Sequence, residues 1–332
     1  MNPPKKVLLI TVRSDVGGGP KHVYDLAKNL TDVEVYIASP LSSPYGSLYT
    51  QLAHKHFQLN HRKFSLIKLF KLIIFCRRNN INKVHSHGRG AGIYSKIMGL
   101  LGFQIIHTFH GVHLPKSRKE QLIILFESLL SFTVRKFISV SKHESLLAYK
   151  LRLSKEENTV TIQNGIDIEE FSSIKPSITR NTLGTLTRLD PHKNNLELIK
   201  FVQSLDGYKL IIAGDGEEKE MLESYIQENS LQERIKLIGQ ASKPAEFLSS
   251  IDTFVSSSKG EGLPYAVLEA MAAKRIIVAS KVSGHVDLLD KSNLYELGNF
   301  NSFKQALQSA DNHFDMKNFD LKQMAQKVSK LY

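Results

Sequence analysis

Short apolar runs alternate with longer amphipathic stretches along this chain, and the alternation predicts buried parallel strands separated by helices. The apolar runs of strand length in the first half are at 7–12, 33–38, 105–110 and 135–140. A second series of such runs is at 182–186, 210–213, 235–238, 253–255 and 276–280. Apolar residues at helical spacing fall between the runs, at 20–30, 63–83, 141–149, 195–205 and 219–229. Two successive strand–helix series predict an α/β protein with two doubly wound, Rossmann-like domains.

The loop after the fourth run of the second series carries the strongest candidate chemistry. Gly260 and Gly262 allow the backbone to turn sharply and to approach a ligand closely. A helix is predicted to start at 263–265, with Pro264 in its first turn, and the N–H groups and dipole of a helix start favour an anion. Glu261 lies in the loop and Glu269 lies on the helix. An anion site between two carboxylates suits a nucleotide sugar, because N–H groups bind a diphosphate and carboxylates bind hydroxyls.

Two cations follow the run 182–186. Arg188 and Lys193 stand five positions apart in the loop between this expected strand and the next helix. A guanidinium binds two phosphate oxygens at once, and an ammonium adds a point charge. The pair is therefore a candidate grip for the phosphates of the same ligand.

Strand ends in the first half supply further candidates. Gly17, Gly18 and Gly19 lie between the first strand and its helix, which is typical of a Rossmann-like unit, although they do not form a clean Gly-x-Gly-x-x-Gly motif. His87 and His110 are expected at the carboxyl ends of strands, where ligands bind in open α/β sheets. Metal ligation by these histidines is less expected, because no carboxylate is spaced to join them.

The spacing of Glu261 and Glu269, followed by Ala270-Met271-Ala272, resembles the paired-glutamate motif of the retaining nucleotide-sugar glycosyltransferases. That family includes bacterial capsule and lipopolysaccharide glycosyltransferases of the group 1 type. Asn164-Gly165-Ile166-Asp167 and Gly214-Asp215-Gly216 resemble two further motifs of the family. The resemblance spans nearly the whole chain and implies the GT-B architecture, in which two Rossmann-like domains face each other across a cleft.

The resemblance also implies a role for each candidate residue. It makes His110, Glu261, Arg188 and Lys193 the catalytic residues, with Glu261 on the donor sugar and Glu269 on the ribose. The residues implied to bind the donor are Gly17, Gly18, Arg188, Lys193, Gly239, Gln240, Glu261, Gly262, Leu263, Pro264, Tyr265 and Glu269. Those implied to bind the acceptor are Gly19, His87 and Arg89. Neither a cofactor nor a metal is expected, since the cations and the helix start stabilise the departing diphosphate.

The expected function is transfer of a sugar from a nucleoside diphosphate sugar, UDP-hexose or UDP-N-acetylhexosamine, to a lipid-linked or surface-polysaccharide acceptor. The expected domains are an acceptor-binding domain at 1–172, a nucleotide-sugar-binding domain at 173–315 and a helix at 316–332 that crosses back to the first domain. The linker is placed near 168–180. The family usually has Gly where Lys274 stands, and this departure affects a turn.

The distribution of charge along the chain predicts a further partner. Residues 1–170 contain 24 Lys and Arg against 12 Asp and Glu, which is the whole net charge of +12, while residues 171–332 contain 20 of each. A basic half favours an acidic partner, such as anionic lipid, a phosphorylated acceptor or nucleic acid. The segment 63–83 combines Lys68, Lys71 and Arg78 with apolar residues. It is either a sheet-packing helix with a solvated basic stripe or a helix that also lies on anionic membrane. Together with the resemblance to the glycosyltransferases, this segment makes an anionic membrane surface the expected partner, and nucleic acid is not expected.

The cysteine count and the apolar runs indicate the cellular compartment. Cys76 is the one cysteine, which excludes a disulfide framework and a cysteine metal site. The first residues do not form a signal peptide, and no apolar run approaches the ~20 residues of a membrane span. We therefore expect a cytoplasmic protein, peripheral on the inner face of the plasma membrane.

Three other functions stay open at this point. A sugar-nucleotide epimerase can share the fold but leaves the basic half unexplained. A non-catalytic partner subunit would lack some residues of the nucleotide-sugar site, whereas Glu261, Glu269, Arg188 and Lys193 are all present. A nicotinamide oxidoreductase would use Gly17 to Gly19, but no acidic residue ~20 positions on clearly follows a second strand.

Overall fold

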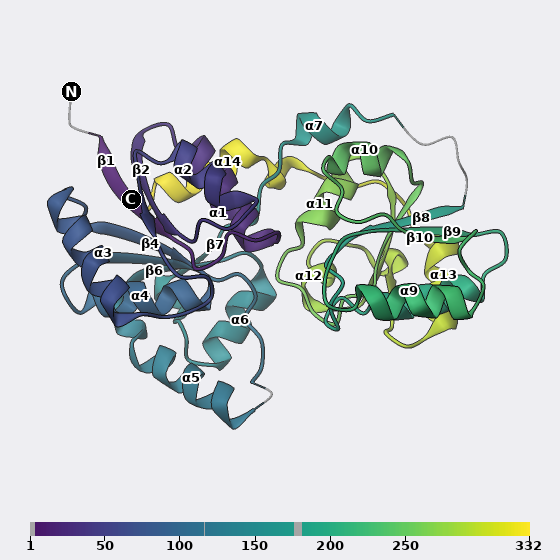
Figure 1. Ribbon diagram of the computed structural model, residues 1–332, viewed down its shortest axis with the longest axis horizontal. Coiled ribbons are helices and arrows are strands. Elements are labelled where there is room, and N and C mark those ends of the chain that lie inside the picture. Colours follow the sequence, from purple (N-terminus) through teal and green to yellow (C-terminus); the bar gives the residue numbers. More distant parts are fainter. Residues whose placement is uncertain (1–3, 116, 176–180) are drawn as a thin grey trace. The chain divides into compact units, whose positions relative to one another are not determined.

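The computed structural model describes residues 4–115, 117–175 and 181–332, and these form two compact units (Figure 1). The first unit contains the described residues up to Gly165 together with Leu321–Tyr332. The second unit contains those from Ile166 to Asp320. Each unit is a parallel sheet covered by helices, which is the Rossmann-like architecture that the strand–helix alternation predicts.

The first unit is built on a sheet of seven described strands in the order β3-β2-β1-β4-β5-β6-β7. Their bounds are β1 Lys5–Ile10, β2 Val33–Ser39, β3 Lys55–Gln58, β4 Lys83–His87, β5 Gln104–Thr108, β6 Val134–Ser139 and β7 Thr159–Thr161. The chain leaves β1 for β2 on one side and returns to pair β4 on the other side of β1. The carboxyl ends of β1 and β4 therefore form the topological switch point of this sheet, where ligands bind in such folds.

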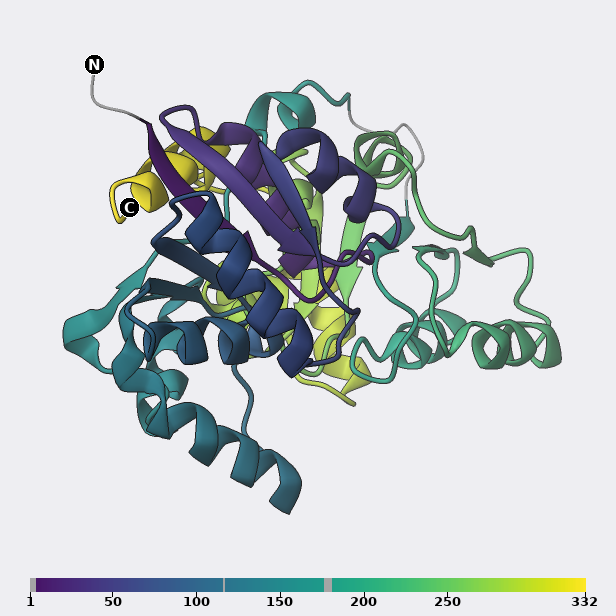
Figure 2. The same ribbon diagram turned by 60° about the vertical axis from the view of Figure 1, so that its left-hand side comes forward.

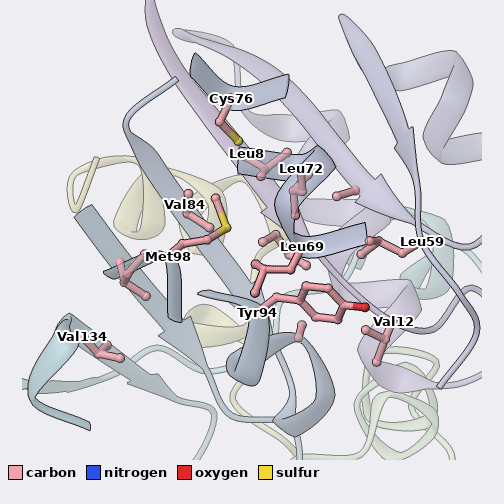
Figure 3. Close-up of a cluster of buried hydrophobic side chains, with 14 of the residues drawn as sticks. Leu8, Val12, Leu59, Leu69, Leu72, Cys76, Val84, Tyr94, Met98 and Val134 are labelled. Atoms are coloured by element: carbon pink, nitrogen blue, oxygen red, sulfur yellow. The ribbon is translucent and has the colours of Figure 1, made fainter. Parts of the chain in front are cut away.

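Helices cover both faces of this sheet. Their bounds are α1 Gly18–Asn29, α2 Tyr45–Leu52, α3 Leu66–Arg78, α4 Arg89–Gly99, α5 Arg118–Leu129, α6 Lys142–Lys150 and α14 Leu321–Ser329. Leu8 of β1 packs with Leu69 and Leu72 of α3 and with Met98 of α4 on one face (Figure 3). Val7 belongs to a second cluster that contains residues of α1 and α14. Burial of both faces explains why the strands have continuous apolar runs rather than an alternating pattern.

The C-terminal helix α14 is part of the first unit. Met324, Ala325 and Val328 pack in the cluster of Val7 and the α1 residues. The last residue, Tyr332, is anchored to β4, because its carbonyl oxygen accepts from the Lys83 ammonium at 2.6 Å. The chain therefore returns to the first sheet after completing the second.

The second unit contains a sheet of six described strands in the order β10-β9-β8-β11-β12-β13. The strands are β8 Thr182–Leu186, β9 Lys209–Ala213, β10 Ile235–Leu237, β11 Thr253–Ser256, β12 Ile276–Ser280 and β13 Leu294–Tyr295. Its helices are α7 Ile168–Ser172, α8 Asn195–Gln203, α9 Lys219–Glu228, α10 Pro244–Ser249, α11 Tyr265–Ala272, α12 Ser283–Val286 and α13 Phe300–Ser309. β8 and β11 are neighbours, so their carboxyl ends form the switch point of this sheet.

The structure differs from the sequence analysis around the boundary between the units. The expected linker at 168–180 begins with the helix α7, which contacts α11 and so belongs to the second unit. The first unit ends at Gly165, before the expected boundary at residue 172. Residues 176–180 of the expected linker lie outside the described residues. Short elements such as α7 have too few periodic positions to be recognised from their pattern.

Lys274 stands at the position where the family usually has glycine, and its backbone has the conformation that glycine favours. It follows α11 with a φ of 54°, in the left-handed region that glycine adopts without strain. Its N–H donates to the carbonyl oxygen of Met271 at 3.0 Å and closes the end of the helix. The difference is confined to this turn.

Among the helices that the structure describes, none combines the length and the apolar character that are needed to cross a membrane.

Candidate active site

The strand order of the second unit brings its candidate residues to one edge of the sheet. Arg188 and Lys193 follow β8, and Glu261 follows β11, the neighbouring strand. More than sixty residues separate them in the chain, and only the switch in strand order places them together.

Lys193 and Glu261 form a contact at this edge. The Lys193 Nζ lies 2.5 Å from Oε1 of Glu261, and the two side chains are 19% and 13% exposed. Burial alone would raise the pKa of the Glu261 carboxyl, but the charge of Lys193, the nearby His285 and a hydrogen bond from Ser258 hold it below its ordinary value. The carboxylate is therefore ionised at neutral pH and can accept hydrogen bonds from hydroxyl groups.

Asp190 connects the two cations of the candidate phosphate grip, and the sequence analysis did not single it out. Its Oδ2 lies 2.9 Å from NH2 of Arg188. Its Oδ1 accepts from the backbone N–H groups of His192 and Lys193, both at 3.1 Å. This turn fixes the start of the loop that carries Lys193, while the Arg188 guanidinium stays 39% exposed. An Asp two positions after the Arg, before a proline, is a turn signal that could have identified it.

The loops after β8 and β11 are joined by hydrogen bonds. Nε2 of His192 donates to the carbonyl oxygen of Gly260 at 2.7 Å. The Ser257 hydroxyl donates to the carbonyl oxygen of Lys193 at 2.9 Å. The position of Glu261 opposite Lys193 is therefore set by the backbone of both loops.

A third loop, at the start of α12, supports the backbone of Glu261. The Ser283 hydroxyl donates to the carbonyl oxygen of Glu261 at 3.1 Å. A Cβ atom on Gly284 would lie 2.7 Å from the carbonyl oxygen of Gly262 and 2.8 Å from the Cβ of Glu261. Position 284 is consequently restricted to glycine by the closeness of these two loops.

The Gly214-Asp215-Gly216 turn packs against the loop of Arg188. A Cβ atom on Gly214 would overlap the carbonyl oxygen of Thr187, and one on Gly216 would overlap that of Leu189. The N–H of Gly214 donates to the carbonyl oxygen of Gly239 at 2.7 Å. Gly239 and the exposed Gln240 thus lie beside this turn in the loop that follows β10, at the same edge of the sheet as the cations.

The helix α11 begins directly after the Glu261 loop. Pro264 was expected inside its first turn, but its ψ of 123° is extended and the helix begins one residue later, at Tyr265. Leu263 and Tyr265 are buried, and the Leu268 N–H donates to the carbonyl oxygen of Pro264 at 3.2 Å. Glu269 lies in the second turn, buried to 5% exposure. The positive end of the α11 dipole therefore points into the loop that holds Glu261.

In the first unit, the three glycines after β1 lie at the start of α1. Gly17 precedes the helix, and Gly18 and Gly19 form its first turn. A Cβ atom on Gly19 would lie 3.8 Å from Cγ of His110, so the helix start lies beside that ring. Gly88, with a φ of 76°, forms the tight turn between His87 at the end of β4 and the start of α4.

His87 and His110 lie together at the switch point of the first sheet. Nδ1 of His87 is 3.3 Å from Nε2 of His110. His22 of α1 joins them, with its ring centroid 4.7 Å from that of His110, and its Nδ1 donates to Oδ1 of Asn164 at 3.0 Å. The sequence analysis missed His22, because a histidine inside a predicted amphipathic helix has no local signal that distinguishes it from a packed residue. It named Asn164 only as part of a family-like motif.

Arg89, in the first turn of α4, contacts α5. Its Nε lies 3.4 Å from Oε2 of Glu127, a buried residue of α5. Burial raises the pKa of Glu127, and the charges of Lys96 and Arg89 oppose this shift. Arg89, Glu127 and His110 line part of a cavity of about 30 Å³.

The loop that carries His110 is held by a residue that the sequence did not single out. The two carboxylate oxygens of Glu144 accept from the N–H groups of Gly111 at 2.7 Å and Val140 at 2.8 Å. Glu144 is buried, and burial raises its pKa despite these hydrogen bonds. The carboxyl group of Glu144 therefore ties the end of β5 to the end of β6.

Two protein-family models match the chain, one for each half. The model described as Glycosyltransferase Family 4 matches residues 16–170, and the model described as Glycosyl transferases group 1 matches residues 167–310. The first match contains the histidines and Arg89, and the second contains Arg188, Lys193 and both glutamates.

Similar proteins agree with these matches. The chain is 26% identical over 269 residues to UDP-Gal:alpha-D-GlcNAc-diphosphoundecaprenol alpha-1,3-galactosyltransferase of Escherichia coli, with 73% of this chain and 69% of that protein covered. It is 25% identical over 360 residues to the capsular polysaccharide biosynthesis glycosyltransferase CapH of Staphylococcus aureus, with 98% of each covered. The crystal structure of Anabaena HepE in complex with UDP and glucose matches its fold with a TM-score of 0.83 at 16% identity, over 98% of this chain and 99% of that one.

Proposed function

Since the chain belongs to the glycosyltransferases that join a family 4 domain to a group 1 domain, we propose that it is a retaining enzyme that moves a sugar from a nucleoside diphosphate sugar to an acceptor hydroxyl. The observation that carries this proposal is the Lys193–Glu261 contact, with Arg188 and the start of α11 beside it. A cation for phosphate and a carboxylate for sugar hydroxyls stand within one hydrogen bond of each other.

The proposed donor is UDP-hexose or UDP-N-acetylhexosamine. The E. coli relative is named for UDP-Gal, and HepE was crystallised with UDP and glucose. Glu269 binds the ribose hydroxyls, Glu261 binds the transferred sugar, and the backbone around Gly239 holds the base. Sugar choice then depends on a few hydroxyl contacts in the pocket.

In the proposed reaction, the bond between the sugar C1 and the β-phosphate oxygen breaks, and UDP leaves with the electron pair. The acceptor oxygen forms its bond to C1 on the same face, and its proton passes to the departing phosphate. Arg188, Lys193 and the α11 dipole stabilise the charge that develops on the diphosphate. These groups perform this task without a metal ion or a cofactor.

The first unit is the proposed acceptor domain, with His87, Arg89 and Gly19 near the acceptor and His110 near the donor sugar. A lipid-linked acceptor is proposed because the E. coli relative is named for a diphosphoundecaprenol-linked sugar. The protein would then work at the cytoplasmic face of the plasma membrane, attached peripherally.

Exposed apolar side chains of the first unit support this attachment. On α5, Leu122, Leu125, Phe126 and Leu129 recur at helical spacing on one face and are exposed. Basic Arg118 and Lys119 lie in the first turn of the same helix. Figure 2 shows that α5 projects beyond the other helices of its unit. An apolar face beside basic residues is the composition of helices that lie on anionic membrane.

The helix α3 offers a second such surface and a refinement of the sequence analysis. Ile67, Phe70 and Lys71 are exposed, whereas the Lys68 ammonium lies 5.9 Å from the ring centroid of Phe57. Lys68 therefore lies against the unit, and Lys71 with Arg78 supplies the exposed basic pair. The same helix buries Leu69, Leu72, Ile73 and Cys76, so it packs on the sheet as well.

One incubation separates the proposed transferase from the alternatives. The purified protein is incubated with a panel of UDP-sugars, and UDP release, epimerised sugar nucleotide and nicotinamide redox change are measured together. UDP release that increases with a lipid-linked glycan acceptor is the expected result. An epimer without UDP release supports the epimerase, and no turnover with any donor in the panel supports a partner subunit.

A further inference from the structure

We propose that His22, His87 and His110 form a binding site for one divalent transition-metal ion of the zinc class, and that this ion inhibits rather than assists the enzyme. Among the described residues, these three histidines form a group whose ligand atoms all lie within 4.8 Å of one another. They come from α1, from β4 and from the loop after β5, so the site exists only in the folded first unit.

The spacing of the nitrogens fits a tetrahedral ion. Nδ1 of His87 and Nε2 of His110 are 3.3 Å apart. Two imidazole nitrogens bound to one zinc at about 2.0–2.1 Å in tetrahedral geometry are separated by about 3.3 Å. The ligand atom of His22 lies within 4.8 Å of the other two, so the three rings must move closer together when they bind one ion.

The ring of His22 is oriented by its surroundings. Its Nδ1 donates to Oδ1 of Asn164 at 3.0 Å, and a carbonyl oxygen only accepts, so Nδ1 carries the proton. Nε2 is then the unprotonated nitrogen, which is the form that binds a metal. A hydrogen bond on the far nitrogen is the arrangement that orients histidine ligands in metal sites.

Each ring can offer one unprotonated nitrogen to an ion, because a neutral imidazole has one N–H group and one acceptor nitrogen. Nε2 of the buried His87 has no hydrogen-bond partner in the described structure. It can therefore carry the proton of this ring while Nδ1 binds the ion.

The ligand set also predicts which ions bind. Three imidazoles without a carboxylate favour Zn²⁺, Ni²⁺, Co²⁺ and Cu²⁺ over Mg²⁺, Mn²⁺ and Ca²⁺, which prefer oxygen ligands. The expected effect on turnover rests on the proposed function, in which His110 contacts the donor sugar. An ion bound to His110 removes that contact, so zinc inhibits the transfer.

Metal binding is tested directly on the full chain, prepared without a polyhistidine tag and freed of metal by dialysis against a chelator. Co²⁺ is titrated and the visible absorption bands of tetrahedral cobalt are recorded, while Zn²⁺ binding is measured by calorimetry. One equivalent of either ion is expected to bind, and Mg²⁺ and Mn²⁺ are expected to give no signal. Absence of the cobalt bands or of stoichiometric zinc binding overturns the site.

Variants locate the ion. His22→Gln and His87→Gln are each expected to weaken zinc binding at least tenfold, because an amide is a poor zinc ligand. His313→Gln, at an exposed histidine of the second unit, is the matched control and is expected to bind zinc like the unmodified protein. Circular dichroism confirms that each variant is folded. Equal zinc affinity in His22→Gln and the unmodified protein overturns the assignment.

Turnover separates the site from the proposed function. Zinc at the concentration that saturates the calorimetric site is expected to reduce UDP release at least tenfold, and a chelator restores it. Stoichiometric cobalt binding with undiminished turnover in zinc supports the metal site but overturns inhibition through His110. Absence of UDP release under every condition contradicts the proposed function, while the cobalt measurement still decides the metal site.

Discussion

The Lys193 ammonium lies 2.5 Å from the Glu261 carboxylate across two loops that end neighbouring strands. The two side chains are mostly buried, so each one compensates the charge of the other. In the proposed function, the diphosphate of the donor would compete with Glu261 for the Lys193 ammonium. Lys193 would then exchange one contact for another, and Glu261 would become available for the sugar.

Removal of the lysine alone should destabilise the fold. Lys193→Met leaves the Glu261 carboxylate without its cation, and we expect a loss of about 2–4 kcal/mol in the free energy of unfolding. The double variant Lys193→Met/Glu261→Gln should lose less than Lys193→Met, because no buried charge remains. Urea denaturation of the unmodified protein, of the single variants Lys193→Met and Glu261→Gln and of the double variant measures the coupling. Losses that simply add would show that the contact contributes nothing to stability.

The stability of Lys193→Met should depend on pH differently from the stability of the unmodified protein. In the unmodified protein the pKa of Glu261 is lowered, so its contribution to stability is present at neutral pH and is lost as the pH falls through that lowered pKa. In Lys193→Met, burial raises the pKa of Glu261, so the carboxylate destabilises the fold at neutral pH and the penalty disappears on protonation. The difference in unfolding free energy should therefore shrink between pH 7 and pH 4. A difference that is constant over this range would contradict the assignment.

The grip residues should govern donor binding. Arg188→Ala or Lys193→Ala is expected to weaken UDP binding roughly tenfold or more, because each removes a charge-assisted contact worth about 1.5–3 kcal/mol. Turnover with UDP-sugar should fall as well. Lys243→Ala, which breaks an exposed pair with Glu246 in the same unit, is the control and should bind UDP normally. If Arg188→Ala binds UDP as tightly as the unmodified protein, Arg188 is a surface residue that does not bind the phosphates.

The two glutamates should have separable roles. Glu269→Ala is expected to weaken binding of both UDP and UDP-sugar, since Glu269 is assigned to the ribose. Glu261→Ala should spare UDP and reduce turnover of UDP-sugar, since Glu261 is assigned to the transferred sugar. Calorimetric titration with UDP distinguishes the two, and an equal loss of UDP affinity in both variants would reject the division of roles.

Chelation should leave the reaction intact. Arg188, Lys193 and the α11 dipole are assigned to the leaving diphosphate, so activity is expected to persist in excess EDTA. Loss of activity in EDTA with recovery on addition of manganese would reject this assignment. Stimulation by EDTA would instead accord with removal of an inhibitory ion.

The first unit should bind anionic membrane. We expect sedimentation with anionic liposomes at low salt but not with neutral ones, because basic residues near an anionic surface contribute roughly 1 kcal/mol each. Salt should weaken this binding, since exposed charges are screened within about 8 Å at physiological ionic strength. Lys71→Gln/Arg78→Gln should reduce binding, as should Leu122→Gln/Leu125→Gln/Leu129→Gln, which removes the apolar face of α5.

A control and a contrary result complete the liposome experiment. Lys209→Gln/Lys236→Gln removes two exposed charges from the second unit and should leave sedimentation and UDP binding unchanged. If the unmodified protein ignores anionic liposomes at low salt, α3 is a sheet-packing helix only and the acceptor is soluble. If only the α5 variant loses binding, α5 is the attachment site and the charges of α3 are solvated.

Much of the fold was accessible from the pattern of residues. The apolar run 276–280 coincides with β12, and the strand-like segment 182–186 coincides with β8, because strands buried on both faces favour apolar and β-branched residues. The segments that the pattern did not indicate include α7 and, between 39 and 62, α2 and β3, where polar and aromatic residues are mixed and the elements are short. The helical pattern at 63–83 was broader than α3, because Ser65 accepts from the Lys68 N–H and starts the helix later.

The sequence by itself determined which residues of the second unit are candidates for its chemistry. Two glutamates, two cations and a glycine loop are local features, and their spacing along the chain predicts a nucleotide-sugar site. The requirement for glycine at 284 was not visible, because it comes from contact with Glu261 and Gly262, more than twenty positions away.

Only the tertiary structure decided which distant residues meet. Strand order places Lys193 against Glu261, and it places His22 of α1 beside His87 and His110 from two other segments. It also brings Met324, Ala325 and Val328 of α14 into one buried cluster with residues of α1. Sequence patterns report which face of an element is buried, but the identity of the partner depends on how the elements assemble, and that is set by long-range packing rather than by local spacing.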